Sequence, residues 1–123
     1  MTEETNSKVK FQYHWDRVQD ETFQTANEKG FHDDDETAHE RWTFPTRIAL
    51  IQGELSEALE AFRKHGMEGK SDHIEHRAVE EELADAVIRI MDLAETHQLD
   101  VVGALVEKAE YNRTRPYKHG KRF

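Results

Sequence analysis

The chain has 123 residues, a formal net charge of -9 and no cysteine, with 36% hydrophobic and 35% charged residues. This length suits one domain over residues 1–123, and the lack of cysteine excludes disulfides, thiolate nucleophiles and cysteine-type zinc sites. The net negative charge argues against nucleic-acid binding. No apolar run approaches the roughly 18 residues of a membrane span, and the N-terminus MTEETNSKVK lacks the apolar centre of a signal peptide. We therefore expect a cytoplasmic protein that contacts neither membrane nor nucleic acid.

The N-terminal third carries two competing patterns. VKFQYHWD, residues 9–16, alternates apolar and polar side chains as a strand does, whereas Phe11, Trp15 and Val18 also fit one helical stripe. Because no partner strand is visible elsewhere, we expect an extended arm over residues 1–15 that leads into a helix ending near Gly30. The acidic stretch FHDDDETAHERWTF, residues 31–44, is then expected to connect this helix to the next.

Three later segments, at about residues 45–64, 72–96 and 100–113, have the period of amphipathic helices, which predicts an all-α fold, a small helical bundle. Pro45 suits the first turn of the first segment. The loop KHGMEGKSD precedes the second, which Asp72 and Glu75 are expected to cap, and Asp100 is expected to cap the third. The apolar stripe of the first helix consists of Ile48, Ile51, Leu55, Leu59 and Phe62, and that of the second of Val79, Leu83, Val87, Ile90 and Ala94.

Two of these helices repeat one acidic pattern, ELSEAL at residues 54–59 and ELADAV at residues 82–87. At about 100° per residue, Glu54 and Glu57 lie to the same side of the first apolar stripe as Glu82 and Asp85 do of the second. If the two helices pack antiparallel, the four carboxylates meet. Two carboxylates about 5 Å apart repel by roughly 3 kcal/mol at an effective dielectric of about 20, so such a cluster needs protons or a cation. All-oxygen ligands favour Mg²⁺, with Mn²⁺ as the alternative. A solvated acidic face is the competing interpretation of each pair taken alone.

The C-terminal stretch KAEYNRTRPYKHGKRF, residues 108–123, reverses the charge of the chain, with six Lys and Arg against one Glu. Lys108, Asn112 and Arg115 lie on one side of a helix or its continuation and offer donors to phosphate oxygens. Residues 114–123 form a basic tail, for which simple solvation is the alternative role.

Together these motifs resemble the all-α nucleoside triphosphate pyrophosphohydrolase superfamily, specifically its small MazG-like members. The family pattern is EExxE on one helix, ExxD on the next and a downstream K…N..R. Here it reads GELSE, EELAD (residues 81–85) and KAEYNRTR, with NEKGF, residues 27–31, resembling a further element of the family. The resemblance covers about residues 27–123. It departs from the pattern at Gly53, which stands where the family has its first Glu.

The resemblance implies metal ligands at Glu54, Glu57, Glu82 and Asp85, and phosphate contacts from Lys108, Asn112 and Arg115. It implies hydrolysis of a nucleoside triphosphate, deoxy or non-canonical, to monophosphate and pyrophosphate. A carboxylate that the metal does not fully use could accept the proton of the attacking water, and we expect this base to be Glu54 or Glu57. The resemblance also implies a homodimer or homotetramer whose assembly completes the bundle. The alternative, kept open by Gly53, is a non-catalytic helical module of the same fold that binds a nucleotide or a protein.

Overall fold

The computed structural model describes residues 2–33 and 40–122, and in the second helix it describes side chains from Thr43 onward. Over these ranges the helices are α1 (Glu3–Glu28), α2 (Glu40–His65), α3 (Ala78–His97), α4 (Val101–Arg113) and the short 3-10 helix η1 (Tyr117–Gly120). The described part of the chain contains no strand, which confirms the all-α class. The connection expected over residues 31–44 ends earlier, because α2 begins at Glu40, while residues 34–39 lie outside the described residues.

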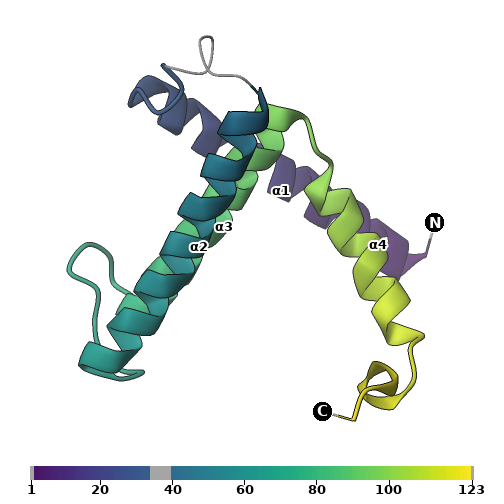
Figure 1. Ribbon diagram of the computed structural model, residues 1–123. Coiled ribbons are helices and arrows are strands. Elements are labelled where there is room, and N and C mark those ends of the chain that lie inside the picture. Colours follow the sequence, from purple (N-terminus) through teal and green to yellow (C-terminus); the bar gives the residue numbers. More distant parts are fainter. Residues whose placement is uncertain (1, 34–39, 123) are drawn as a thin grey trace.

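The helices form two arms (Figure 1). The first, which we call the acidic arm, consists of α2 and α3, and the second consists of α4 and the part of α1 that packs against it. Helices α2 and α3 lie side by side and antiparallel, which is the arrangement that brings their two acidic patterns together. Helix α4 diverges from the end of α3 and packs mainly against α1, which also crosses α3. The site formed by α2 and α3 is therefore bordered by α1, whereas α4 belongs to the other arm.

Helix α1 occupies the region where an extended arm was expected over residues 1–15, and that prediction was wrong. The helix starts at Glu3, and Thr2 caps it, because the Thr2 side chain accepts a hydrogen bond from the Thr5 N–H at 3.0 Å. Its packed stripe is partly polar: Gln19 is buried, receives a hydrogen bond from the Trp15 indole and donates one to Glu95 of α3. Because the packed side of α1 includes a glutamine, its apolar residues alone do not show a clear helical period. The alternation of apolar and polar residues over 9–16 therefore suggested a strand where the chain is helical.

Helix α3 begins at Ala78 and not at Asp72, so the predicted Asp72–Glu75 cap was also wrong. Ser71 organises this region instead, because its hydroxyl accepts the N–H groups of His73 and Ile74 and donates to the Glu81 carboxylate at 2.8 Å. These bonds fold the chain into a turn that is fixed to α3, and the helix starts only afterwards.

Of the two other predicted helix starts, that of α2 was wrong and that of α4 is confirmed. Pro45 lies inside α2 and not in its first turn, since the helix already begins at Glu40; Pro45 therefore lacks one internal hydrogen bond. The predicted cap of α4 is confirmed, because the Asp100 carboxylate accepts the Gly103 N–H at 2.9 Å.

Much of the apolar stripe of α2 is exposed, although its helical period predicts a buried stripe. Ile51 is buried, but Leu55, Leu59 and Phe62 are 50%, 58% and 47% exposed. Leu83 and Val87 of α3 are likewise exposed, at 50% and 40%. The less exposed side of α2 contains Ile51, Glu54, Ala58 and Ala61. The acidic side of each helix thus faces the partner helix, and much of each leucine-rich side faces outward.

Candidate metal centre and adjoining cleft

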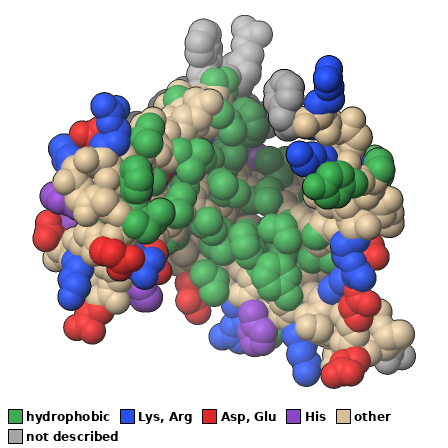
Figure 2. Space-filling model, turned by 90° about the horizontal axis from the view of Figure 1, so that it is seen from below, with side chains coloured by type: hydrophobic (Ala, Val, Ile, Leu, Met, Phe, Trp, Pro, Cys, Tyr) green, Lys and Arg blue, Asp and Glu red, His purple; other side chains and the backbone are tan. Residues whose placement is uncertain are grey.

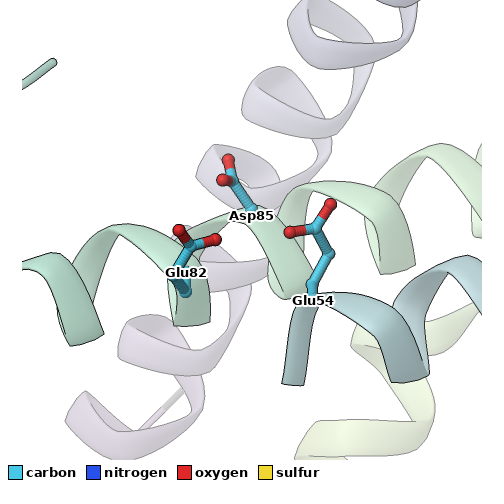
Figure 3. Close-up of side chains that lie close together, drawn as sticks. All are labelled: Glu54, Glu82 and Asp85. Carbon is cyan, nitrogen blue, oxygen red and sulfur yellow. The ribbon is translucent and has the colours of Figure 1, made fainter. Parts of the chain in front are cut away.

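Three of the four predicted acids come together between α2 and α3 (Figure 3). Glu54 of α2 and Glu82 and Asp85 of α3 each offer a carboxylate oxygen, and these oxygens lie within 4.8 Å of one another. All three residues are half-buried. Small neighbours such as Ala58 allow the two helices to approach, and the antiparallel packing then sets one acidic pattern against the other.

Glu57, the fourth predicted acid, lies next to Glu82 rather than in the three-acid group. Burial raises the pKa of Glu82 to about 7, helped by a hydrogen bond with Glu57 and by the charges of Glu57, Asp85 and Glu54. A bond that raises this pKa is one in which protonated Glu82 donates to the Glu57 carboxylate. Without a cation, Glu82 therefore keeps its proton at pH values well above those at which a carboxylic acid usually ionises.

The pKa of Asp85 is raised as well, first by burial and then by the charges of Glu54 and Glu81, while the nearby Arg89 opposes this shift. Like charges held together away from water favour either protons or a metal ion. The oxygens of Glu54, Glu82 and Asp85 are ligands of the type that Mg²⁺ and Mn²⁺ prefer, so the donor set fits such an ion.

Arg89, which was not predicted as a site residue, places a positive charge beside the three acids. Its Nε donates to Oε1 of Glu54 at 2.6 Å, and the Glu54 side chain is only 12% exposed. The signal was present in the sequence, because Arg89 follows Asp85 by four residues and Glu82 by seven and so shares their side of α3. It was missed because only acids were sought on that side.

A cleft of about 590 Å³ is lined by two of the three acids, Glu54 and Asp85, and lies among α1, α2 and α3. Its cationic lining residues are Lys29, Arg47 and Arg89. Leu50 and Ile88 supply apolar walls, and the 70% exposed Phe31 stands at the cleft. Its remaining lining residues are Glu21, Thr22, Thr25, Ala26 and Asp92. The cleft has the size of a small-molecule site, for which about 300–1,000 Å³ is usual.

A buried polar network supports one wall of this cleft. His32 Nε2 lies 2.8 Å from one carboxylate oxygen of Asp92, and Arg47 donates to the other at 3.1 Å. The side chains of these three residues are 6–15% exposed. The network joins the segment after α1 to both α2 and α3. Sequence reasoning missed it, since Asp92 resembles a surface acid until its partners are known.

The predicted phosphate contacts lie in the other arm. Lys108 and Arg115 both lie over the Tyr111 ring, at 4.5 and 5.6 Å from its centre. Asn112 is half-buried, and among the described residues its Oδ1 has no hydrogen-bond partner. Because α4 packs mainly against α1, the single chain does not bring this basic group to the acids.

Gly53 is an exposed residue of α2, and a side chain there meets no atom within 4 Å. Packing around the Cβ position therefore does not require this glycine.

Comparisons with protein-family models, curated proteins and solved structures find no match for this chain. No helix in the described ranges is long and apolar enough to cross a membrane.

Proposed function

We propose that this protein is a metal-dependent hydrolase that converts a nucleoside triphosphate, deoxy or non-canonical, into a nucleoside monophosphate and pyrophosphate. The observation that carries the proposal is the position of Glu54, Glu82 and Asp85, gathered from two helices beside a cleft of about 590 Å³. Such a cleft is large enough to enclose much of a nucleotide. The motifs that resemble the MazG-like proteins support the same activity.

Glu54, Glu82 and Asp85 are the residues that would hold Mg²⁺ or Mn²⁺, with Glu57 beside them. When bound, the ion supplies charge for the phosphates and lowers the pKa of a water molecule. Glu54 or Glu57 is the candidate to accept the proton of that water. Glu57 is exposed and lies outside the three-acid group, which leaves its second oxygen available for this task.

The cleft would orient the substrate through its two kinds of lining. Leu50, Ile88 and Phe31 offer apolar surface to the base and sugar, while Lys29 and Arg89 offer positive charge to the phosphates. Holding the outer phosphates together makes pyrophosphate the natural leaving group, because water then attacks the innermost phosphorus.

A pyrophosphate-release assay tests this function. Canonical, deoxy and damaged triphosphates are supplied with Mg²⁺, and at least one of them should yield pyrophosphate and monophosphate. In ¹⁸O-labelled water the label should enter the monophosphate. Orthophosphate as the first product, with diphosphate accumulating, would contradict the proposed bond cleavage.

Self-association into a homodimer or homotetramer belongs to the same proposal. Hydrophobic side chains gather in the hollow between the two arms (Figure 2). The exposed apolar residues of the acidic arm include Leu55, Leu59, Phe62, Leu83 and Val87. So many exposed apolar side chains mark an interaction surface, and a second copy supplies matching surface.

In such an assembly, Lys108, Asn112 and Arg115 of one copy would reach the acids of another. Size-exclusion chromatography with light scattering should give a mass at least twice 14.4 kDa. A particle of 14.4 kDa across micromolar concentrations would exclude this arrangement.

Gly53 favours one second candidate, a non-catalytic module that binds a nucleotide or a protein. The pattern that this chain resembles has a glutamate at this position, and packing does not explain the glycine, because a Cβ there meets no described atom within 4 Å. This alternative predicts nucleotide binding without pyrophosphate release.

A further inference from the structure

Arg89 stands between the acidic group and the cleft and contacts both. Its Nε bonds to Glu54 at 2.6 Å, and its side chain also lines the cleft and is 37% exposed. Arg47, another cation of the cleft, is held differently: its side chain is 14% exposed and bonds to Asp92 and His32. Of these two arginines, Arg89 is therefore the one with room to change partner.

The bond to Glu54 conflicts with a cation at the same carboxylate. An oxygen that accepts a guanidinium N–H at 2.6 Å offers less charge to a metal ion. The positive charge of Arg89 also repels any divalent ion bound to Asp85, one helical turn away on α3. A cation at this position weakens metal binding, so its presence calls for a role in another state of the site.

We propose that Arg89 neutralises Glu54 while no metal is bound, and that it turns into the cleft to bind a phosphate of the ligand when a metal engages Glu54. This inference rests on the proposed metal-dependent function. An arginine suits both partners, because its planar fork matches a carboxylate and a phosphate equally well. Its long side chain permits the change without movement of α3.

The exchange couples the two ligands. Metal binding frees the guanidinium for phosphate, and phosphate binding removes a cation from the metal site. Each ligand should therefore strengthen the other by the same factor, since such coupling is reciprocal.

Calorimetric titration of the full chain tests the proposal with Mg²⁺ alone and with diimidotriphosphate, a base-free triphosphate analogue that resists hydrolysis. We compare the wild type with Arg89→Met. The variant should bind Mg²⁺ about five- to tenfold more tightly, because a competing positive charge is gone. In saturating Mg²⁺ it should bind the analogue at least about tenfold more weakly, because a charge-assisted contact is gone.

Arg63→Met is the matched control, since it removes the same charge from an exposed position nine residues beyond Glu54 on α2. It should change neither affinity. Arg89→Lys keeps a positive charge but loses the fork, so its Mg²⁺ affinity should stay near that of the wild type while the analogue binds less tightly. This variant decides the question if Arg89→Met does not fold.

Two results would overturn the proposal. Weaker or unchanged Mg²⁺ binding by Arg89→Met would mean that Arg89 only holds Glu54 in place. Unchanged analogue binding would mean that Arg89 does not reach a phosphate. Failure of the proposed function looks different, because the wild type would then release no pyrophosphate even while these affinities shift as expected.

Discussion

Carboxyl groups in the two arms have their pKa values shifted in opposite directions. Between α2 and α3, burial and neighbouring acids raise the pKa values of Glu82 and Asp85. Between α1 and α4, hydrogen bonds and charge from Lys8 and then Arg113 lower the pKa of the exposed Glu4. Glu4 thus has its counter-charges within the chain, whereas Glu54, Glu82 and Asp85 share one nearby cation among the described residues, Arg89. An added cation would relieve the remaining repulsion among these three acids.

The interaction energies expected in the two arms differ in size. Two carboxylates about 5 Å apart at an effective dielectric of about 20 repel by roughly 3 kcal/mol, which is a large part of a stability of about 5–15 kcal/mol. Exposed ion pairs such as Lys8–Glu110 and Arg113–Glu4 contribute little to stability, because solvent and salt screen their attraction. Substitutions in the two arms should therefore differ in both size and sign.

The largest effect is expected for Asp85→Asn. It removes a metal ligand, so Mg²⁺ binding should be lost and turnover should fall at least about 100-fold, since even loss of an outer-shell partner costs about 10–100-fold. The metal-free protein should not lose stability at pH 8, because the variant removes one charge from a crowded group. Calorimetry and the pyrophosphate assay measure these quantities.

Glu4→Gln in the other arm is the control, and it should leave turnover and Mg²⁺ affinity unchanged. If Asp85→Asn keeps turnover within a few-fold of the wild type, the acidic group is not the active site.

The next effect concerns the basic residues Lys108 of α4 and Arg115, which follows the end of α4. Lys108→Ala and Arg115→Ala should each raise the KM for the triphosphate about tenfold, the usual scale for one lost charge-assisted contact, while Mg²⁺ affinity stays constant. Lys10→Ala, an exposed lysine of the same arm, is the matched control. Steady-state kinetics that do not change in either variant would assign the tail a role in solvation only.

The acidic site was predictable from the sequence because its geometry is local. Glu54 and Glu57 lie on one helical side, as do Glu82 and Asp85, and a short connection makes antiparallel packing the simple outcome. Arg89 follows from the same spacing. The Asp92–His32–Arg47 network does not, because it joins three segments that are far apart in the chain.

The direction in which each helix faces was harder to predict. Apolar period alone assigned Leu55, Leu59 and Phe62 to the packed side of α2, yet they are exposed in the single chain. In α1, the buried Gln19 gives no apolar signal at all. Both errors have one cause: burial follows the partner surface, and the period of one segment does not contain that surface.

The smallest predicted effect is a pH dependence that belongs to the acidic arm alone. The folded protein raises the pKa of Glu82 to about 7, above the ordinary value of 4.5, so it binds a proton that the unfolded chain releases in this interval. Stability from this group is therefore full below about pH 4.5, declines as the pH rises, and is lost above about pH 7. The side chain of the variant Glu82→Gln cannot ionise, so it lacks this pH dependence.

In EDTA the melting temperature of Glu82→Gln should match that of the wild type at pH 5 and exceed it by a few degrees at pH 8. Added Mg²⁺ at pH 8 should raise the melting temperature of the wild type much more than that of the variant, because binding to the folded state stabilises it. Calorimetric scans at both pH values measure the difference, and a Glu82→Gln protein that melts below the wild type at pH 8 in EDTA would refute the raised pKa.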